Sequence, residues 1–300
     1  MTGRTVESRL FCDVALARRI ERAEAQFIGA CAEAAAGRRG DRSGFSRPIA
    51  GGVAGYAEPD SPLNKVAGLG FAGAPDLTAL DAVEQAYAAR GAPVQVELAA
   101  LADPAVPALL AGRGYRLLSF ENVLGRALGD PVEPVEAPGV DVRPSGDDEF
   151  DTWLDVVVEA ALHPDAQGVP WLEEFPREML ENAERDAAGL VRRHLARLDG
   201  VPAGGGGMRL TDGIAQLTGA GTAPAFRRRG IQSALLSARL AEATAAGCDL
   251  AVITVQPGSK SQQNAQRRGF ELLYTRAVLA LEPSPPRVAR TRDDGSGNRF

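Results

Sequence analysis

Three consecutive arginines stand directly before a glycine, at Arg227-Arg228-Arg229-Gly230. Residues 214–221 have the pattern of a strand that Pro224 would end, and the Ala- and Leu-rich residues from 231 to about 246 predict a helix. The first backbone amides of a helix have no partner within it, and with the helix dipole they favour a bound anion. The turn is therefore predicted to bind phosphate, and the arginines add positive charge.

The elements around this turn must hold it at the edge of a sheet. Asp199-Gly200 is a hairpin signal between two strand-like runs, and residues 250–255 read as a buried strand that follows Gly247. Within the predicted helix, Ile231, Leu235, Ala238 and Ala241 recur at helical spacing and would form the buried face. A solvated basic turn on some other α/β protein is the alternative interpretation.

The turn resembles the acyl-CoA loop of the GCN5-related N-acetyltransferase (GNAT) superfamily, which reads Arg/Gln-x-x-Gly-x-Gly/Ala. Here the residues are Arg227-x-x-Gly230-x-Gln232, with Gln in the last position in place of a small residue. The order and spacing of elements agree over residues 140–281, including Gly269-Phe270 after the last helix. The resemblance implies an α/β (α+β) fold, a mixed, mostly antiparallel twisted sheet flanked by helices.

Composition restricts the function classes. The formal net charge of −6 argues against a protein that mainly wraps nucleic acid. Three scattered cysteines and two distant histidines supply no metal-ligand spacing, and we expect no metal and a reducing, cytoplasmic compartment. No apolar run is long enough to cross a membrane, and the N-terminus lacks the apolar core of a signal peptide.

The first half of the chain repeats features of the second. Residues 113–118 align with residues 268–273, and Gly91 aligns with Gly247 at the end of an Ala-rich helix. Gly70 and Gly91 are separated by five residues fewer than Gly221 and Gly247, and we place that difference at the arginine loop. The hypothesis is a tandem GNAT-like protein whose N-terminal copy has lost the phosphate site; chance similarity of two α/β segments is the alternative. The predicted organisation is a degenerate GNAT-like domain at 1–130 with an opening helix at 7–36, a linker at 131–144, a catalytic domain at 145–283 and a disordered tail at 284–300.

The resemblance also implies which residues hold the cofactor. Backbone groups of the strand before the loop would meet the pantetheine arm, and the loop would hold the pyrophosphate. A residue of the last helix would bind pantetheine, with Ser261 alternatively an N-terminal cap, and an arginine near that helix would reach the nucleotide phosphates. The predicted set is Ala220, Gly221, Thr222, Arg227, Arg228, Arg229, Gly230, Ile231, Gln232, Ser233, Ser261, Asn264 and Arg268.

The catalytic residues are predicted less directly. Many members of the family carry a Tyr four residues before the Gly-Phe to protonate the leaving thiolate, and Ala265 stands at that position here. Tyr274 is the substitute candidate for the acid, with half-buried packing as the alternative. His163 lies in the segment that covers the acceptor in the family, as do Trp171, Glu173 and Glu174, and is the candidate for contact with the amine.

These observations predict an N-acetyltransferase. It would transfer the acetyl group of acetyl-CoA to a primary amine of a small molecule by direct attack in a ternary complex, since no Cys or Ser stands in a nucleophile motif. We expect no nucleic-acid or membrane partner and leave a homodimer open. A non-catalytic acyl-CoA-binding sensor or interaction module is the alternative, which the Ala at position 265 favours. A nucleic-acid binder that uses the arginines is a third reading.

Overall fold

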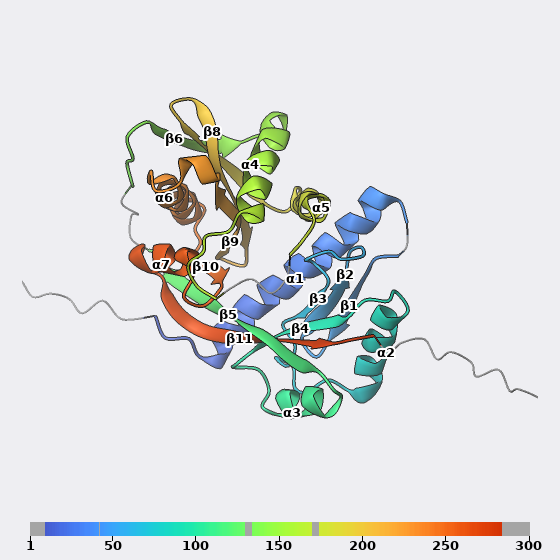
Figure 1. The fold of residues 1–300 in the computed structure, drawn as a ribbon. Helices are drawn as coiled ribbons and strands as arrows, with labels where there is room; N and C mark the ends of the chain where they lie inside the picture. Colours follow the sequence, from blue (N-terminus) through green and yellow to red (C-terminus); the bar gives the residue numbers. More distant parts are fainter. Residues whose placement is uncertain (1–9, 42, 130–133, 170–173, 284–300) are drawn as a thin grey trace, which may run out of the picture.

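The computed structural model describes residues 10–41, 43–129, 134–169 and 174–283, so the tail predicted at 284–300 lies outside them. The described residues form one 11-stranded, mostly antiparallel sheet flanked by helices (Figure 1), which confirms the predicted fold class. The strands are β1 (Phe45–Ile49), β2 (Gly52–Tyr56), β3 (Lys65–Ala67), β4 (Val94–Ala99), β5 (Arg116–Ala127), β6 (Val140–Ser145), β7 (Arg192–Leu198), β8 (Val201–Thr211), β9 (Ile214–Thr222), β10 (Leu250–Val255) and β11 (Glu271–Leu281).

Seven α-helices and two 3₁₀ turns connect the described strands. The helices are α1 (Val14–Arg39), α2 (Leu77–Ala88), α3 (Ala105–Gly112), α4 (Phe150–Leu162), α5 (Arg177–Ala187), α6 (Ile231–Ala245) and α7 (Lys260–Arg267), and the 3₁₀ turns are η1 (Asp147–Glu149) and η2 (Pro224–Phe226). Among these described helices, none is long and apolar enough to cross a bilayer.

The strand order β1-β2-β3-β4-β11-β5-β10-β9-β8-β7-β6 shows that the two halves exchange their last strands. β3 and β4 are parallel neighbours, as are β9 and β10, but β11 pairs with β4 while β5 pairs with β10. β5 and β11 meet antiparallel at the centre, with Glu121 opposite Arg276. The aligned residues 113–118 and 268–273 thus lead into the two exchanged strands, and the domain boundaries stay a prediction.

The helices that follow β3 and β9 differ in ways that the repeat hypothesis did not foresee. α2 has 12 residues and α6 has 15, so part of the five-residue difference lies in the helix and not only in the arginine loop. Asp76 stands at the N-cap of α2, where its carboxylate would repel a phosphate. The structure also differs from the predicted linker at 131–144, because strand β6 begins at Val140, within that range.

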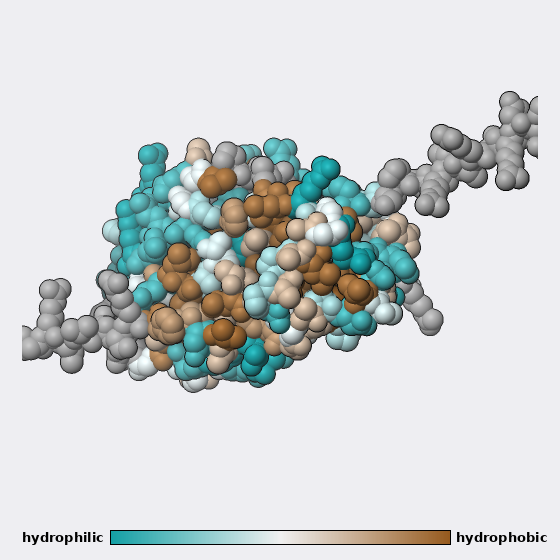
Figure 2. Space-filling model, turned by 90° about the horizontal axis from the view of Figure 1, so that it is seen from below, coloured by the Kyte–Doolittle hydropathy of each residue, from teal (hydrophilic) through white to brown (hydrophobic). Residues whose placement is uncertain are grey.

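Helix α1 crosses the face of the sheet opposite to α6. It begins at Val14, later than the predicted residue 7, and its N-cap is Asp13, whose side chain accepts from the Leu16 amide at 2.8 Å. Ala17, Ile20 and Ala23 pack with residues of β5, β9, β10 and β11, whereas Leu236 and Leu240 of α6 pack on the other face. The helix therefore lies against strands from both halves of the chain. Exposed apolar side chains remain on the central strands, at Leu117, Leu118 and Phe120 of β5 and Leu272 of β11, and apolar residues gather on the face seen in Figure 2.

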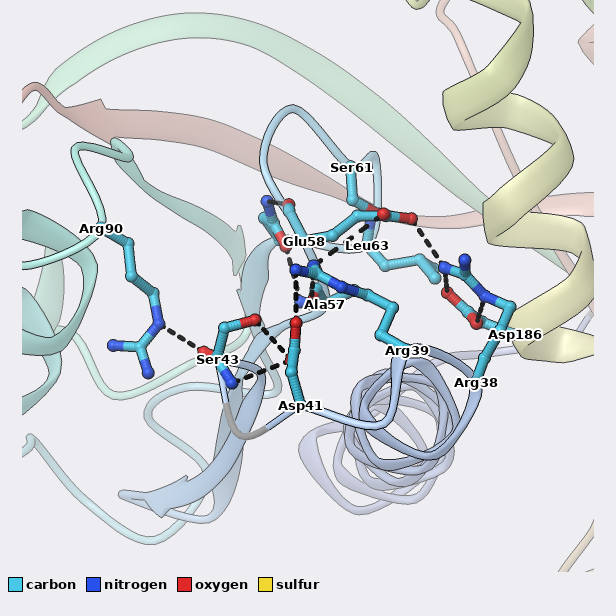
Figure 3. A network of polar contacts seen from close by, with 11 residues as sticks. Arg38, Arg39, Asp41, Ser43, Ala57, Glu58, Ser61, Leu63, Arg90 and Asp186 are labelled. Atoms are coloured by element: carbon cyan, nitrogen blue, oxygen red, sulfur yellow. Dashed lines mark hydrogen bonds and ion pairs between the residues drawn. The ribbon is translucent and has the colours of Figure 1, made fainter.

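The C-terminal end of α1 is fixed to the two halves by one arginine. Arg38 forms two bonds to the carboxylate of Asp186 on α5, at 2.7 and 3.1 Å, and one to Glu58 after β2, at 2.7 Å (Figure 3). Asp186 is 3% exposed and Glu58 8% exposed. The neighbouring Arg39 pairs with the more exposed Asp41 at 2.7 Å.

We expect Arg38→Ala to lower the free energy of unfolding by roughly 2–4 kcal/mol, because it leaves the buried Asp186 carboxylate without its cation. Arg22→Ala, on the same helix, is the matched control, because Arg22 pairs only with the exposed Asp212 among the described residues, at 3.2 Å, and this predicts a loss below about 1 kcal/mol. Urea unfolding of both variants at neutral pH measures the difference. Equal losses of unfolding free energy in the two variants would mean that the Arg38 cluster does not help to hold the two halves of the chain together.

Candidate active site

The strand before the arginine loop bends away from its parallel neighbour. β9 pairs with β10 from Ile214 opposite Leu250 to Leu217 opposite Ile253, yet β9 continues to Thr222. Between the pairs Gly205–Gly221 and Gly207–Thr218 the register of β8 and β9 shifts, which places Gly219 and Ala220 opposite a single residue. Such a bulge bends a strand and increases its twist. Gly219 has a φ of +45°, which favours glycine at the bulge.

A buried arginine holds the bulge from the α6 side. Arg239 is 1% exposed and donates to the carbonyls of Gly207 at 3.0 Å, Leu235 at 3.2 Å and Thr218 at 3.5 Å. Burial lowers the pKa of this guanidinium to about 10. The predicted buried face of α6 is wrong in part, because Arg239 and Leu240 are buried whereas Ala241 is exposed. The bulge interrupts the hydrogen bonds between β8 and β9, and the Arg239 guanidinium donates to backbone carbonyls there in their place.

The arginine loop has the backbone geometry of an anion-binding turn. Arg228 and Gly230 have φ values of +64° and +80°, and α6 begins at Ile231 directly after them. The Ala234 amide is the first to donate within the helix, to the Gly230 carbonyl at 3.0 Å. The amides before it point out of the helix end, as an anion site requires.

A cavity of about 570 Å³ lies at this helix end. Arg228, Arg229, Gly230 and Ser233 line one side of it, and residues 135–138 line another. The Val135 amide donates to Ser237 of α6 at 3.2 Å, which holds this segment beside the loop. The corner is thus open. Gly230 and the two arginines suit a diphosphate, whereas Glu136 and Asp199, which also line the cavity, would have to lie away from it.

The structure brings most of the predicted cofactor residues to one place. Ala220, Gly221 and Thr222 end β9, and the loop and the first turn of α6 follow directly. Asn264 of α7 donates to Gln232 at 2.6 Å, and Arg268 donates to Ser237 of α6 at 3.3 Å. The N-cap of α7 is Ser259, which accepts from the Gln262 amide at 3.1 Å, so the alternative cap at Ser261 is wrong. The binding roles of these residues stay predictions.

A loop crosses the gap between β9 and β10. Arg227 donates to the His163 carbonyl and lies 3.7 Å from Asp165, at the β9 side. Farther along the loop, a Cβ on Gly168 would lie 2.8 Å from Ser259, which follows β10. The loop after α4 therefore spans the mouth of the divergent strands. The resemblance implied that this segment covers the acceptor, but its two contacts join residues distant along the chain and could not be predicted.

The predicted catalytic residues do not meet at this mouth. The exposed His163 ring lies with its Nδ1 3.0 Å from the Glu159 carbonyl and 3.2 Å from the Glu159 carboxylate. Tyr274 is buried on β11, which β5 and β10 separate from β9, and it donates to Glu21 of α1 at 2.7 Å. Burial raises the pKa of this phenol well above its usual value. Glu174 is exposed, and Trp171 and Glu173 lie outside the described residues.

The structure adds one carboxylate that the sequence did not single out. Glu184 of α5 lies against the β9 bulge, and its Oε1 is 2.9 Å from the position of a Cβ on Gly219. Burial raises the pKa of this carboxyl to about 7. A glutamate in a strongly charged helix carries no sequence signal for burial, so only the packing of α5 on β9 reveals it. Among the described residues, no group of His, Cys, Asp or Glu could hold a metal ion.

Comparison with known proteins identifies the family of one part of the chain. Residues 157–270 match the acetyltransferase (GNAT) family, and these residues form a domain of that family. A search of curated proteins found no match. The whole chain has the fold of GNAT proteins.

Solved structures share this fold. A GCN5-related N-acetyltransferase from Kribbella flavida is similar over 90% of this chain and 96% of its own, with 22% identity and a TM-score of 0.63. A GCN5-related N-acetyltransferase from Sphaerobacter thermophilus is similar over 69% of this chain and 68% of its own, with 22% identity and a TM-score of 0.53. A tandem GNAT protein from the clavulanic acid biosynthesis pathway is similar over 69% of this chain and 70% of its own, with 15% identity and a TM-score of 0.53.

Proposed function

We propose that the protein transfers an acetyl group from acetyl-CoA to a primary amine of a small molecule. The observation that carries this proposal is the open corner at the start of α6, where Arg228, Arg229 and Gly230 border a cavity. The strand that leads into this corner, β9, separates from β10 after Leu217. The family match to residues 157–270 supports acyl transfer from an acyl-CoA. The N-terminal half, with Asp76 at the corresponding helix end, is proposed as a copy without cofactor.

In this proposal the residues of the chain bind and orient. The amides before Ala234 and the loop arginines would hold the diphosphate, and the free edge of β9 beyond Leu217 would bind the pantetheine amides. With the thioester fixed at the bulge, an amine that enters beside residues 163–169 would attack it directly. Tyr274 as the acid stays a prediction, and the proposal does not depend on it.

A non-catalytic acyl-CoA sensor is the second candidate, and one observation favours it. Ala265 is 1% exposed and packs in the core with Leu236 and Phe270, so this position offers no acid. Release of CoA thiol decides between the candidates. We expect release when acetyl-CoA and the protein are mixed with spermidine, glucosamine, tyramine or lysine, whereas CoA binding without release from any amine would support the sensor.

A further inference from the structure

Glu184 occupies a position that the binding of a cofactor does not explain. Its carboxylate lies against Gly219 at the bulge of β9, two residues before Gly221 in the stretch that leaves β10. It makes no hydrogen bond or ion pair with any described residue, and burial alone accounts for its raised pKa. Its side chain is only partly exposed. A partly buried carboxylate that has no partner among the described residues is destabilising, which suggests that it is kept for a use.

The charged groups of the neighbouring elements α1 and β8 have partners other than Glu184. The Cys31 thiol of α1 is within electrostatic range of Glu184, and also of Asp186, Glu24 and Arg209. Arg209 of β8 donates to Gln216 at 2.7 Å and to the Ala23 carbonyl at 2.9 Å. Gln216 donates in turn to Glu24 at 3.2 Å.

On its own helix, Glu184 has no competing partner either. Asp186 is bound by Arg38 at 2.7 Å, and Glu181 lies 3.7 Å from Arg177. Arg185 lies 3.6 Å from Asp151. Burial is the one cause that raises the pKa of Glu184, so no cation among the described residues stabilises its charged form.

A primary amine reaches an enzyme as an ammonium ion, since its pKa is near 10, and it must lose a proton before it can attack. A carboxylate that titrates near neutral pH is suited to accept that proton, and partial exposure lets it pass the proton to water. Glu184 lies at the bulge where the proposed acyl group would be fixed. Its position and its basicity therefore both suit the removal of a proton from the attacking amine.

We propose that Glu184 binds the ammonium group of the acceptor at the β9 bulge and removes its proton as general base; this rests on the proposed function. The neutral nitrogen attacks the thioester carbon, the C–N bond forms and the C–S bond breaks. The second proton leaves the nitrogen for the departing sulfur, which gives the amide and the free thiol. Glu184 then returns its proton to solvent. The acceptor is therefore a cationic primary amine.

Glu184→Gln tests this role, because it keeps the shape of the side chain and removes its basicity. With the amine of the panel that reacts fastest, we expect kcat/KM at pH 7.5 to fall about 10²–10⁴-fold, the range for loss of a general base. CoA affinity by calorimetry should stay unchanged. Glu181→Gln, one turn earlier on α5, is the matched control and should retain activity.

Two further readouts separate catalysis from packing. In the wild type, activity should fall below about pH 7 as Glu184 is protonated, and this acid limb should disappear in Glu184→Gln. The raised pKa means that ionisation above pH 7 opposes folding. The variant should therefore have a higher Tm than the wild type at pH 8 and no such advantage at pH 5, whereas a packing role predicts a lower Tm at both.

The outcomes distinguish this inference from the proposed function. If the wild type acetylates an amine and Glu184→Gln keeps more than half of the activity with the same acid limb, the role of Glu184 is overturned and acetyl transfer stands. If the wild type releases no thiol with any amine, both are overturned. If Glu184→Gln does not fold, the wild type alone tests the role. Wild-type activity that does not fall below about pH 7 would then overturn it.

Discussion

Replacing Gly230 by Glu is expected to reduce the affinity for CoA at least 100-fold while the protein still folds cooperatively. Gly230 borders the cavity at the start of α6, so the variant places a carboxylate where the diphosphate would lie. Like charges brought together at a binding site cost several kcal/mol, and 100-fold corresponds to about 2.7 kcal/mol. Calorimetric titration with CoA measures the loss.

Backbone strain must be separated from charge in this experiment. Gly230 has a φ of +80°, and a Cβ on it would lie 2.7 Å from the Ala137 methyl group, so any side chain costs stability there. Gly247 at the other end of α6 has a φ of +78° and open space around it. Gly247→Glu therefore makes the same change of charge and conformation away from the cavity, and it should bind CoA normally. Undiminished affinity in Gly230→Glu would place the cofactor elsewhere.

Arg276→Met is expected to lower the free energy of unfolding at pH 7 by roughly 3–5 kcal/mol, the usual cost of breaking a buried ion pair from one side. Arg276 is 1% exposed at the centre of the exchanged strands, with Nε 2.7 Å from Glu21 and Nη1 3.4 Å from Glu97. Glu21 also accepts the Tyr274 hydroxyl at 2.7 Å. The substitution leaves these carboxylates buried without their shared cation.

The loss should depend on pH. Burial works to raise the pKa of Glu97, but Lys65 and Arg276 hold it below its usual value. A carboxyl with a lowered pKa stabilises the fold above the pKa of the unfolded chain and loses that contribution as the pH falls. The deficit of Arg276→Met should therefore begin to shrink near pH 4.5 and shrink further when urea unfolding is repeated at lower pH.

A surface arginine gives the comparison for this measurement. Arg192 is 57% exposed and pairs with Glu242 at 2.8 Å, so Arg192→Met should cost less than about 1 kcal/mol at either pH. A similarly small loss for Arg276→Met would show that the central cluster does not hold the exchanged strands together.

Several elements of the site followed from local sequence. The hairpin at Asp199-Gly200 forms with φ values of +50° and +82°, and β10 has the predicted bounds. Helix α6 begins after Gly230, as the change from strand to helix pattern predicted. These features depend on residues a few positions apart, whose conformational preferences and apolar spacing are written in order along the chain.

Contacts between distant segments were decided only by tertiary packing. The spacing of apolar residues tells which face of a strand is buried but not which strand lies beside it, so the exchange of β5 and β11 and the position of Tyr274 against Glu21 could not be predicted. The tether from Arg227 to His163 and the approach of Glu184 to Gly219 join segments far apart in the chain. The sequence determined the glycine turn at the start of α6, because its conformation is local. The fold determined which side chains lie against the β9 bulge, because burial and partners depend on how whole elements pack.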